Sequence, residues 1–232
     1  MSLRPLVPVV AGVLVVGVLG YVAWALLAGP STEPLAYVSA PITAPAATHA
    51  EPVEAPVEAP TSAASAVPAP NEAWVARVAA KAGIPVPAMR AYARAQLARP
   101  QGCALGWTTL AGIGWVESQH GTLGGRVLGD DGRSSTPIVG PALSGGLDHA
   151  YGPMQFIPST WARWASDGDG DGLADVDDLD DAAMTAMRYL CGTGQDLTTG
   201  AGWSQAVFAY NHSQAYVDQV RAAADTYAER TR

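Results

Sequence analysis

An uncharged apolar run near the start of the chain limits its fold more than any other feature. Residues 6–28 read LVPVVAGVLVVGVLGYVAWALLA, 23 residues without an acidic or basic side chain. As an α-helix rising about 1.5 Å per residue, the run would be roughly 34 Å long, enough to cross a bilayer. Arg4 precedes it, the next basic residue is Arg77, and Tyr21 and Trp24 lie toward its outer end. We therefore predict a single-pass membrane anchor with a cytoplasmic N-terminus and an extracytoplasmic bulk.

A cleaved signal peptide is the alternative interpretation of this N-terminal segment, residues 1–28, and it would make the protein secreted. A lipoprotein is excluded, because the two cysteines, Cys103 and Cys191, both lie far from the apolar run.

Residues 29–71 form a segment rich in Pro, Ala and Glu, with the repeat EPVEAPVEAP at residues 51–60. Frequent prolines oppose helix formation, and the segment lacks large apolar residues spaced to build a core. We predict a disordered linker that could reach on the order of 130 Å at about 3.1 Å per residue.

Residues 72–232 are long enough for one hydrophobic core and carry mainly helical patterns. Apolar stripes at helical spacing include Met89, Ala93 and Leu97, whereas no series of strands and hairpins is evident. Asn71 and Ser159 are candidate N-caps, Pro158 suits a helix entry, and a glycine-rich loop is expected at about residues 121–146. The predicted fold class is therefore mainly α, with a membrane helix and a linker before the domain.

The formal net charge of −8 argues against nucleic acid as a partner, because phosphate binding needs a basic face. The charge is uneven, since eight aspartates fall within residues 167–181. Without them the domain has 12 basic and 9 acidic residues, so most of its surface is mildly basic.

Cys103 and Cys191 are expected to form a disulfide, since the extracytoplasmic environment is oxidising. Cys103 precedes one predicted helix and Cys191 ends another, so the bond would clamp the start of one helix to the end of the other. Two buried free thiols are the alternative.

Residues 167–178 read DGDGDGLADVDD, which matches the spacing of an EF-hand calcium loop. The template assigns six ligands, the last with Asp in place of the usual Glu: Asp167, Asp169, Asp171, the carbonyl of Leu173, Asp175 and Asp178. A hard cation would neutralise carboxylates that otherwise repel one another, so we predict structural Ca²⁺ and no organic cofactor. A solvated acidic turn is the alternative.

Glu117 is the carboxylate best placed for chemistry. Helical spacing from Leu110 through Ile113 and Gly114 puts it on the apolar stripe of a predicted helix. Partial burial there would raise the pKa of the carboxyl and keep it protonated, the state that a general acid needs. A glutamate pointing into water at a frayed helix end is the alternative.

Three motifs occur around Glu117 and after it: ESQHG at residues 117–121, YGPMQFIPSTW at 151–161, and AVFAYN at 206–211, followed by AYV at 215–217. Together they resemble the lytic transglycosylases, most closely the lytic murein transglycosylase B type of actinobacterial secreted or membrane-anchored members. The resemblance covers roughly residues 72–220 and implies a lysozyme-like helical fold. It also implies that the partners are peptidoglycan glycan strands, while the apolar N-terminal segment gives the membrane as a second partner.

The resemblance implies that Glu117 is the catalytic acid and base. In that family the acid protonates the oxygen between N-acetylmuramic acid and N-acetylglucosamine, then deprotonates the muramic acid 6-hydroxyl, which closes a 1,6-anhydro ring. Ser118, Gln155, Tyr210 and Asn211 match the substrate-binding positions. Tyr210 is also expected to hydrogen bond with Glu117, and Ser118 has helix capping as an equal alternative.

Two other functions remain open at this stage. A hydrolytic muramidase on the same fold would need a second carboxylate, for which Asp130, Asp131 and Asp148 are available. A non-catalytic wall-binding module would not require Glu117 together with Gln155.

Overall fold

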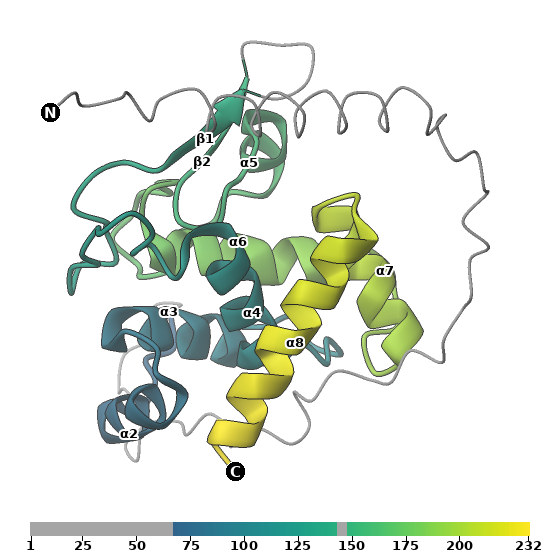
Figure 1. The fold of residues 1–232 in the computed structure, drawn as a ribbon, viewed down its shortest axis with the longest axis horizontal. Helices are drawn as coiled ribbons and strands as arrows, with labels where there is room; N and C mark the ends of the chain where they lie inside the picture. The colour runs from purple at the N-terminus through teal and green to yellow at the C-terminus, as the bar shows by residue number, and fades with distance from the viewer. Residues whose placement is uncertain (1–66, 143–147) are drawn as a thin grey trace, which may run out of the picture. The chain divides into compact units, whose positions relative to one another are not determined.

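The computed structural model describes residues 67–142 and 148–232, which belong to one compact unit (Figure 1). The predicted membrane helix and all but the last residues of the predicted linker lie outside the described residues. Within the described part, no helix is both long enough and apolar enough to span a membrane.

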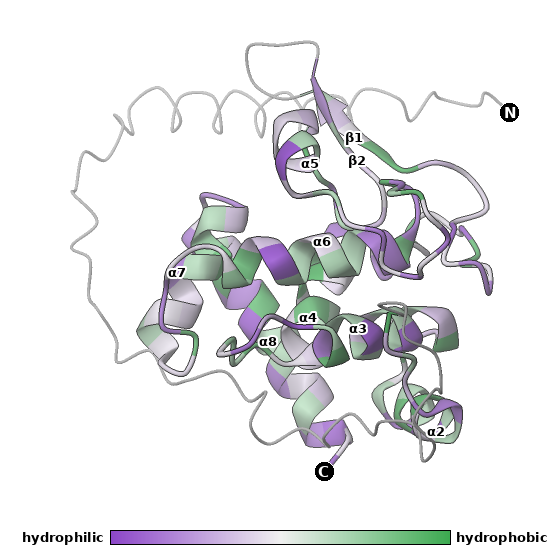
Figure 2. Ribbon diagram, turned by 180° about the vertical axis from the view of Figure 1, so that it is seen from behind, coloured by the Kyte–Doolittle hydropathy of each residue, from purple (hydrophilic) through white to green (hydrophobic). Residues whose placement is uncertain are grey.

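The described chain is mainly helical, as the sequence predicts. Its helices are α2 (Glu72–Ala82), α3 (Val86–Leu97), α4 (Trp107–Ser118), α5 (Pro158–Trp164), α6 (Leu179–Cys191), α7 (Gly200–Tyr210) and α8 (Gln214–Arg230). Helix α6 lies between two groups of elements, with α3 and α4 on one side and α5 with the short strands on the other (Figures 1 and 2). The predicted stripe residues Met89 and Ala93 are fully buried.

Helix α4 lies at the centre of the domain, packed against α3, α6 and α8 (Figure 2). It is buried along most of its length. Every residue from Trp107 to Gly114 is buried, so this helix has no broad polar face. Helix α8 crosses it closely at Gly112, where a Cβ atom would lie 2.7 Å from the carbonyl oxygen of Val220. A side chain at Gly112 would force the two helices apart, so this glycine sets the α4–α8 distance.

The expected glycine-rich loop contains a strand that the sequence pattern did not reveal. Strand β1 (Val139–Ala142) pairs antiparallel with β2 (His149–Tyr151), with an irregularity in the register. β1 has the sequence VGPA, which lacks alternating large apolar residues, so pairing with β2 rather than intrinsic preference defines it.

The predicted N-cap is correct at α2 and displaced at α5. Asn71 caps α2, its side chain accepting a hydrogen bond from the backbone N–H of Trp74 at 3.0 Å. Helix α5 begins at Pro158, and its N-cap is Ile157 rather than the predicted Ser159. Proline suits the first helical position because its fixed φ angle is already helical and it has no N–H to satisfy.

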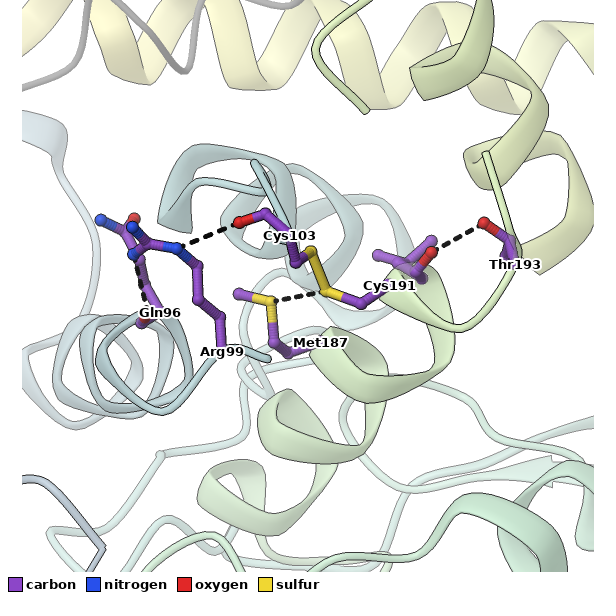
Figure 3. Close-up of a disulfide and its surroundings, with 7 residues drawn as sticks. Gln96, Arg99, Cys103, Met187, Cys191 and Thr193 are labelled. Carbon is purple, nitrogen blue, oxygen red and sulfur yellow. Dashed lines mark hydrogen bonds between the residues drawn. A yellow bond between two sulfur atoms is a disulfide. The ribbon is translucent and has the colours of Figure 1, made fainter. Parts of the chain in front are cut away.

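The predicted disulfide between Cys103 and Cys191 is confirmed (Figure 3). It joins the turn before α4 to the last residue of α6, with 5.7 Å between the two Cα atoms and a sequence separation of 88 positions. Arg99 supports the turn by donating hydrogen bonds to the carbonyls of Cys103 and Gln96. The bond therefore fixes the start of the central helix against α6.

Replacing both cysteines by serine should lower the free energy of unfolding by about 2–5 kcal/mol, because the unfolded chain would regain the entropy of a long open loop. Thermal and urea denaturation of the native protein and the double variant would measure the difference. Reductant should destabilise the native protein by a similar amount and leave the variant unchanged. Equal stability of the two proteins would show that the crosslink contributes nothing.

Candidate active site

Glu117 occupies the last turn of α4, where the helix emerges from the core. Burial raises the pKa of its carboxyl to about 7, the main cause being the loss of water around the charged form. This agrees with the predicted position on the apolar stripe. Near neutral pH the side chain can thus either donate or accept a proton.

The hydroxyl of Tyr216 is the hydrogen-bond donor to Glu117, with 2.6 Å between Tyr216 Oη and Glu117 Oε1. This bond stabilises the carboxylate and partly offsets the effect of burial on the Glu117 pKa. The family resemblance predicts Tyr210 in this role, but Tyr210 donates instead to the carbonyl of Met154 at 2.8 Å. The Tyr210 and Tyr216 rings stack with an interplanar angle of 5°.

Tyr216 lies in the first turn of α8, and Ser213 is the N-cap of that helix. The sequence motifs alone predict no role for Tyr216. The sequence signal for Tyr216 is the AYV segment at residues 215–217, which belongs to the family motifs but carries no assigned function.

A cavity of about 680 Å³ opens beside Glu117. Its walls come from β1, β2, the start of α5, α6 and the end of α7, and the lining residues include Glu117, Gln155, Thr160, Tyr189, Tyr210 and Asn211. Among the described residues that line it, Glu117 is the sole carboxylate. The cavity thus joins a proton donor to aromatic and amide side chains, a combination that suits a sugar ring.

Gln155 and Asn211, two of the predicted substrate-binding residues, line this cavity together with Tyr210. Gln155 has a left-handed backbone, with φ of 52°, and its amide donates to the carbonyl of Gly152 at 2.8 Å. Its Oε1 lies so close to Gly140 of β1 that a Cβ atom there would be 2.4 Å away. A residue held in this conformation by its surroundings is typical of a functional site.

Ser118 has a different position from the one predicted for a substrate-binding residue. It is fully buried, and its hydroxyl donates to the carbonyl of Pro153 at 2.5 Å and accepts from the N–H of Gly121 at 2.8 Å. Both bonds are internal, so Ser118 fixes the end of α4 to the segment before Gln155. The C-cap of α4 is Gln119, so Ser118 anchors the helix end rather than caps it.

The aspartate loop between α5 and α6 brings three carboxylates together. Oxygen atoms of Asp167, Asp169 and Asp181 lie within 4.8 Å of one another. Asp167 also accepts hydrogen bonds from the N–H groups of Gly170 and Gly172, which fold the loop around it. Burial raises the pKa of Asp181 to about 6. Closely spaced carboxylate oxygens are the donors that Ca²⁺ prefers, so these residues fit that ion.

Three of the predicted carboxylate ligands lie outside this cluster: Asp171, Asp175 and Asp178. Asp178 is the N-cap of α6 and accepts from the N–H of Asp180 at 2.9 Å. Asp181, in the first turn of α6, faces the loop and accepts hydrogen bonds from the N–H groups of Gly168 and Asp175.

Arg133 binds the other half of the loop. Its guanidinium lies 2.6 Å from Asp175 and 3.6 Å from Asp178. The next residue, Ser134, donates to the carbonyl of Gly121 at 2.8 Å, immediately after the ESQH sequence. The segment before β1 therefore contacts both the aspartate loop and the end of α4.

Comparison with known families identifies the part of the chain that forms most of the cavity. The transglycosylase SLT domain family matches residues 138–224. The match includes Gln155, Tyr210, Asn211 and Tyr216, and it begins after Glu117, whose assignment rests on the geometry described above and on the ESQHG motif.

Among solved structures, the chain is similar to the Escherichia coli lytic transglycosylase SLT35 in complex with bulgecin A. The sequences are 15% identical, and the alignment covers 67% of this chain and 78% of that one, with a TM-score of 0.44. No curated protein sequence matches the chain.

Replacing Tyr216 by Phe should raise the Glu117 pKa further above 7, by roughly one unit, because the carboxylate loses its hydroxyl donor. A ¹³C NMR titration of the glutamate carboxyl carbons would measure it. Tyr210→Phe is the matched control, since that hydroxyl binds the Met154 carbonyl. An unchanged or lower pKa in Tyr216→Phe would contradict the assigned bond.

Proposed function

We propose that the protein is a peptidoglycan lytic transglycosylase in which Glu117 acts as both acid and base. The observation that carries this proposal is a partly buried glutamate, with its pKa near 7, as the sole carboxylate among the described residues lining the SLT-domain cavity. A transglycosylase needs one group that gives a proton and then takes another, whereas ordinary glycosidases need two carboxylates.

The reaction follows from this single residue. Protonated Glu117 gives its proton to the glycosidic oxygen between N-acetylmuramic acid and N-acetylglucosamine as the bond to C1 breaks. The carboxylate then accepts the proton of the muramic acid 6-hydroxyl, whose oxygen bonds to C1 and closes the 1,6-anhydro ring. Glu117 ends protonated, and no water is consumed.

The neighbouring side chains support the two states of Glu117 and hold the sugar. Tyr216 donates to the carboxylate formed after the first proton transfer, so it stabilises the base form. Gln155 and Asn211 present amide groups to the cavity, and the Tyr189 and Tyr210 rings add aromatic surface. These are the groups that we assign to binding the N-acetylated sugars.

A hydrolytic muramidase fits the geometry less well. The three aspartates considered for its second carboxylate, Asp130, Asp131 and Asp148, are not among the described residues lining the Glu117 cavity. Asp148 is exposed, and Asp131 accepts a hydrogen bond from the N–H of Arg133 in its own turn.

We also propose that Ca²⁺ stabilises the aspartate loop through Asp167, Asp169 and Asp181. Three carboxylates at this spacing repel one another, and a divalent cation would remove that repulsion. The ion's contribution would be structural, because the loop lies outside the cavity lining.

The proposed substrate places the domain outside the cytoplasmic membrane, where peptidoglycan is found. The apolar run at residues 6–28 and the linker at residues 29–71 support a tethered domain that reaches the wall. The disulfide agrees with an oxidising compartment.

Glu117→Gln should reduce cleavage of purified peptidoglycan by a factor of about 10² to 10⁴ or more, because the amide can neither give nor take the proton. Mass spectrometry of the native digest should show ends that are one water lighter than hydrolysed ends. Asp148→Asn, an exposed acid beside β2, is the matched control and should retain native activity. Native-level cleavage by Glu117→Gln, or hydrated ends alone, would overturn the proposal.

Asp181→Asn should abolish the rise in melting temperature that Ca²⁺ gives the native protein, because it removes one of the three clustered carboxylates. Calorimetry with Ca²⁺ and with a chelator would measure both binding and stability. Asp171→Asn, in the same loop but outside the cluster, should keep most of the effect. If Asp171→Asn lost the Ca²⁺-dependent rise in melting temperature and Asp181→Asn kept it, the result would favour the EF-hand template over the observed cluster.

A further inference from the structure

His120 is a buried imidazole that the proposed mechanism does not use. It follows Glu117 by three residues and is only 2% exposed. Its Nδ1 lies 2.9 Å from the hydroxyl of Tyr92 on α3, and its Nε2 lies 2.9 Å from the hydroxyl of Tyr227 on α8. One side chain thus joins the end of α4 to two other helices.

The imidazole is a fixed neutral group. Burial lowers the His120 pKa to about 3, so the ring is uncharged over the working pH range. A neutral ring donates from one nitrogen and accepts at the other, which matches two tyrosine hydroxyls, one as acceptor and one as donor. Both nitrogens are therefore occupied within the protein, and His120 cannot pass protons to the cavity.

The surrounding backbone is arranged to keep this contact. Gln119 and His120 both have left-handed conformations, with φ of 52° and 60°, which non-glycine residues hold only when their surroundings enforce it. Gly114 is the second adaptation, because a Cβ atom there would lie 2.0 Å from the Tyr92 hydroxyl oxygen. Glycine at position 114 lowers the helix propensity of α4, but it leaves space for the Tyr92 hydroxyl to reach the imidazole.

One face of α8 contacts both Glu117 and His120 at the end of α4. Tyr216 and Tyr227 are eleven residues apart, which is about three helical turns. Tyr216 donates to Glu117, and Tyr227 binds His120, so two bonds tie α8 to the end of α4. A shift of α8 along α4 that breaks one of these bonds would also strain the other.

We propose that His120 is a positioning residue whose Nε2 bond to Tyr227 fixes α8 along the end of α4 and so holds the Tyr216 hydroxyl on Glu117. Its consequence for turnover rests on the proposed function, whereas its effect on the Glu117 carboxyl does not. The titratable groups that face Glu117 are Tyr216 and Tyr210. Those that face His120 are Tyr92 and Tyr227.

Two amide variants separate positioning from general stabilisation. In His120→Gln the amide reaches the place of Nε2 and keeps a partner for Tyr227. In His120→Asn the amide reaches the place of Nδ1 and keeps a partner for Tyr92 only. Asn tolerates the left-handed conformation at residue 120 better than Gln, so a purely structural role predicts that Asn is the better replacement.

We expect His120→Gln to keep the Glu117 pKa close to the native value in a ¹³C NMR titration without substrate. His120→Asn and Tyr227→Phe should raise it by roughly half a unit to one unit, as partial loss of the Tyr216 bond does. Since Glu117 must start protonated, the alkaline limb of the pH–rate profile should move upward by the same amount. Tyr227→Phe combined with Tyr216→Phe should shift the pKa no further than Tyr216→Phe alone.

A native Glu117 pKa in both His120→Asn and Tyr227→Phe would overturn the inference, as would equal shifts in the Gln and Asn variants. Melting temperatures recorded on the same samples would show that a shift is not the result of unfolding. If Glu117→Gln remains fully active, the proposed function fails, while the NMR result still decides the role of His120.

Discussion

The close crossing of α4 and α8 is the contact on which the site depends. α4 is buried on nearly all sides, and a side chain at Gly112 would push α8 away. The crossing brings Tyr216 to Glu117 and Tyr227 to His120. The spacing of the two helices at this crossing therefore determines whether the Tyr216 hydroxyl can reach the Glu117 carboxylate at hydrogen-bond distance.

Several features were predictable because they depend on local pattern or composition. The two cysteines had one possible intramolecular pairing, and helical spacing was enough to place Glu117 on a buried stripe. The helical class followed from apolar periodicity. The choice between Tyr210 and Tyr216 as the donor was different, since both follow Glu117 by about a hundred residues and only the relative orientation of α7 and α8 separates them.

The carboxylate cluster shows a second limit of sequence templates. The EF-hand pattern counts residues along the loop and gives the last position to Asp178. In the structure Asp178 caps α6, and it is Asp181, one turn later, whose carboxylate lies with those of Asp167 and Asp169. Strand β1 was missed for a related reason, because its four residues gain their conformation from β2 rather than from their own sequence.

Arg133 and Ser134, which are adjacent in sequence, connect the acidic loop to the end of α4. Arg133 holds Asp175 of the acidic loop, and Ser134 holds the residue that follows His120. The energetic effects of substitutions in the acidic loop and at the end of α4 are therefore not independent. No loop aspartate is among the described residues lining the cavity beside Glu117, so this coupling runs through the backbone around Arg133 and Ser134 rather than through the cavity.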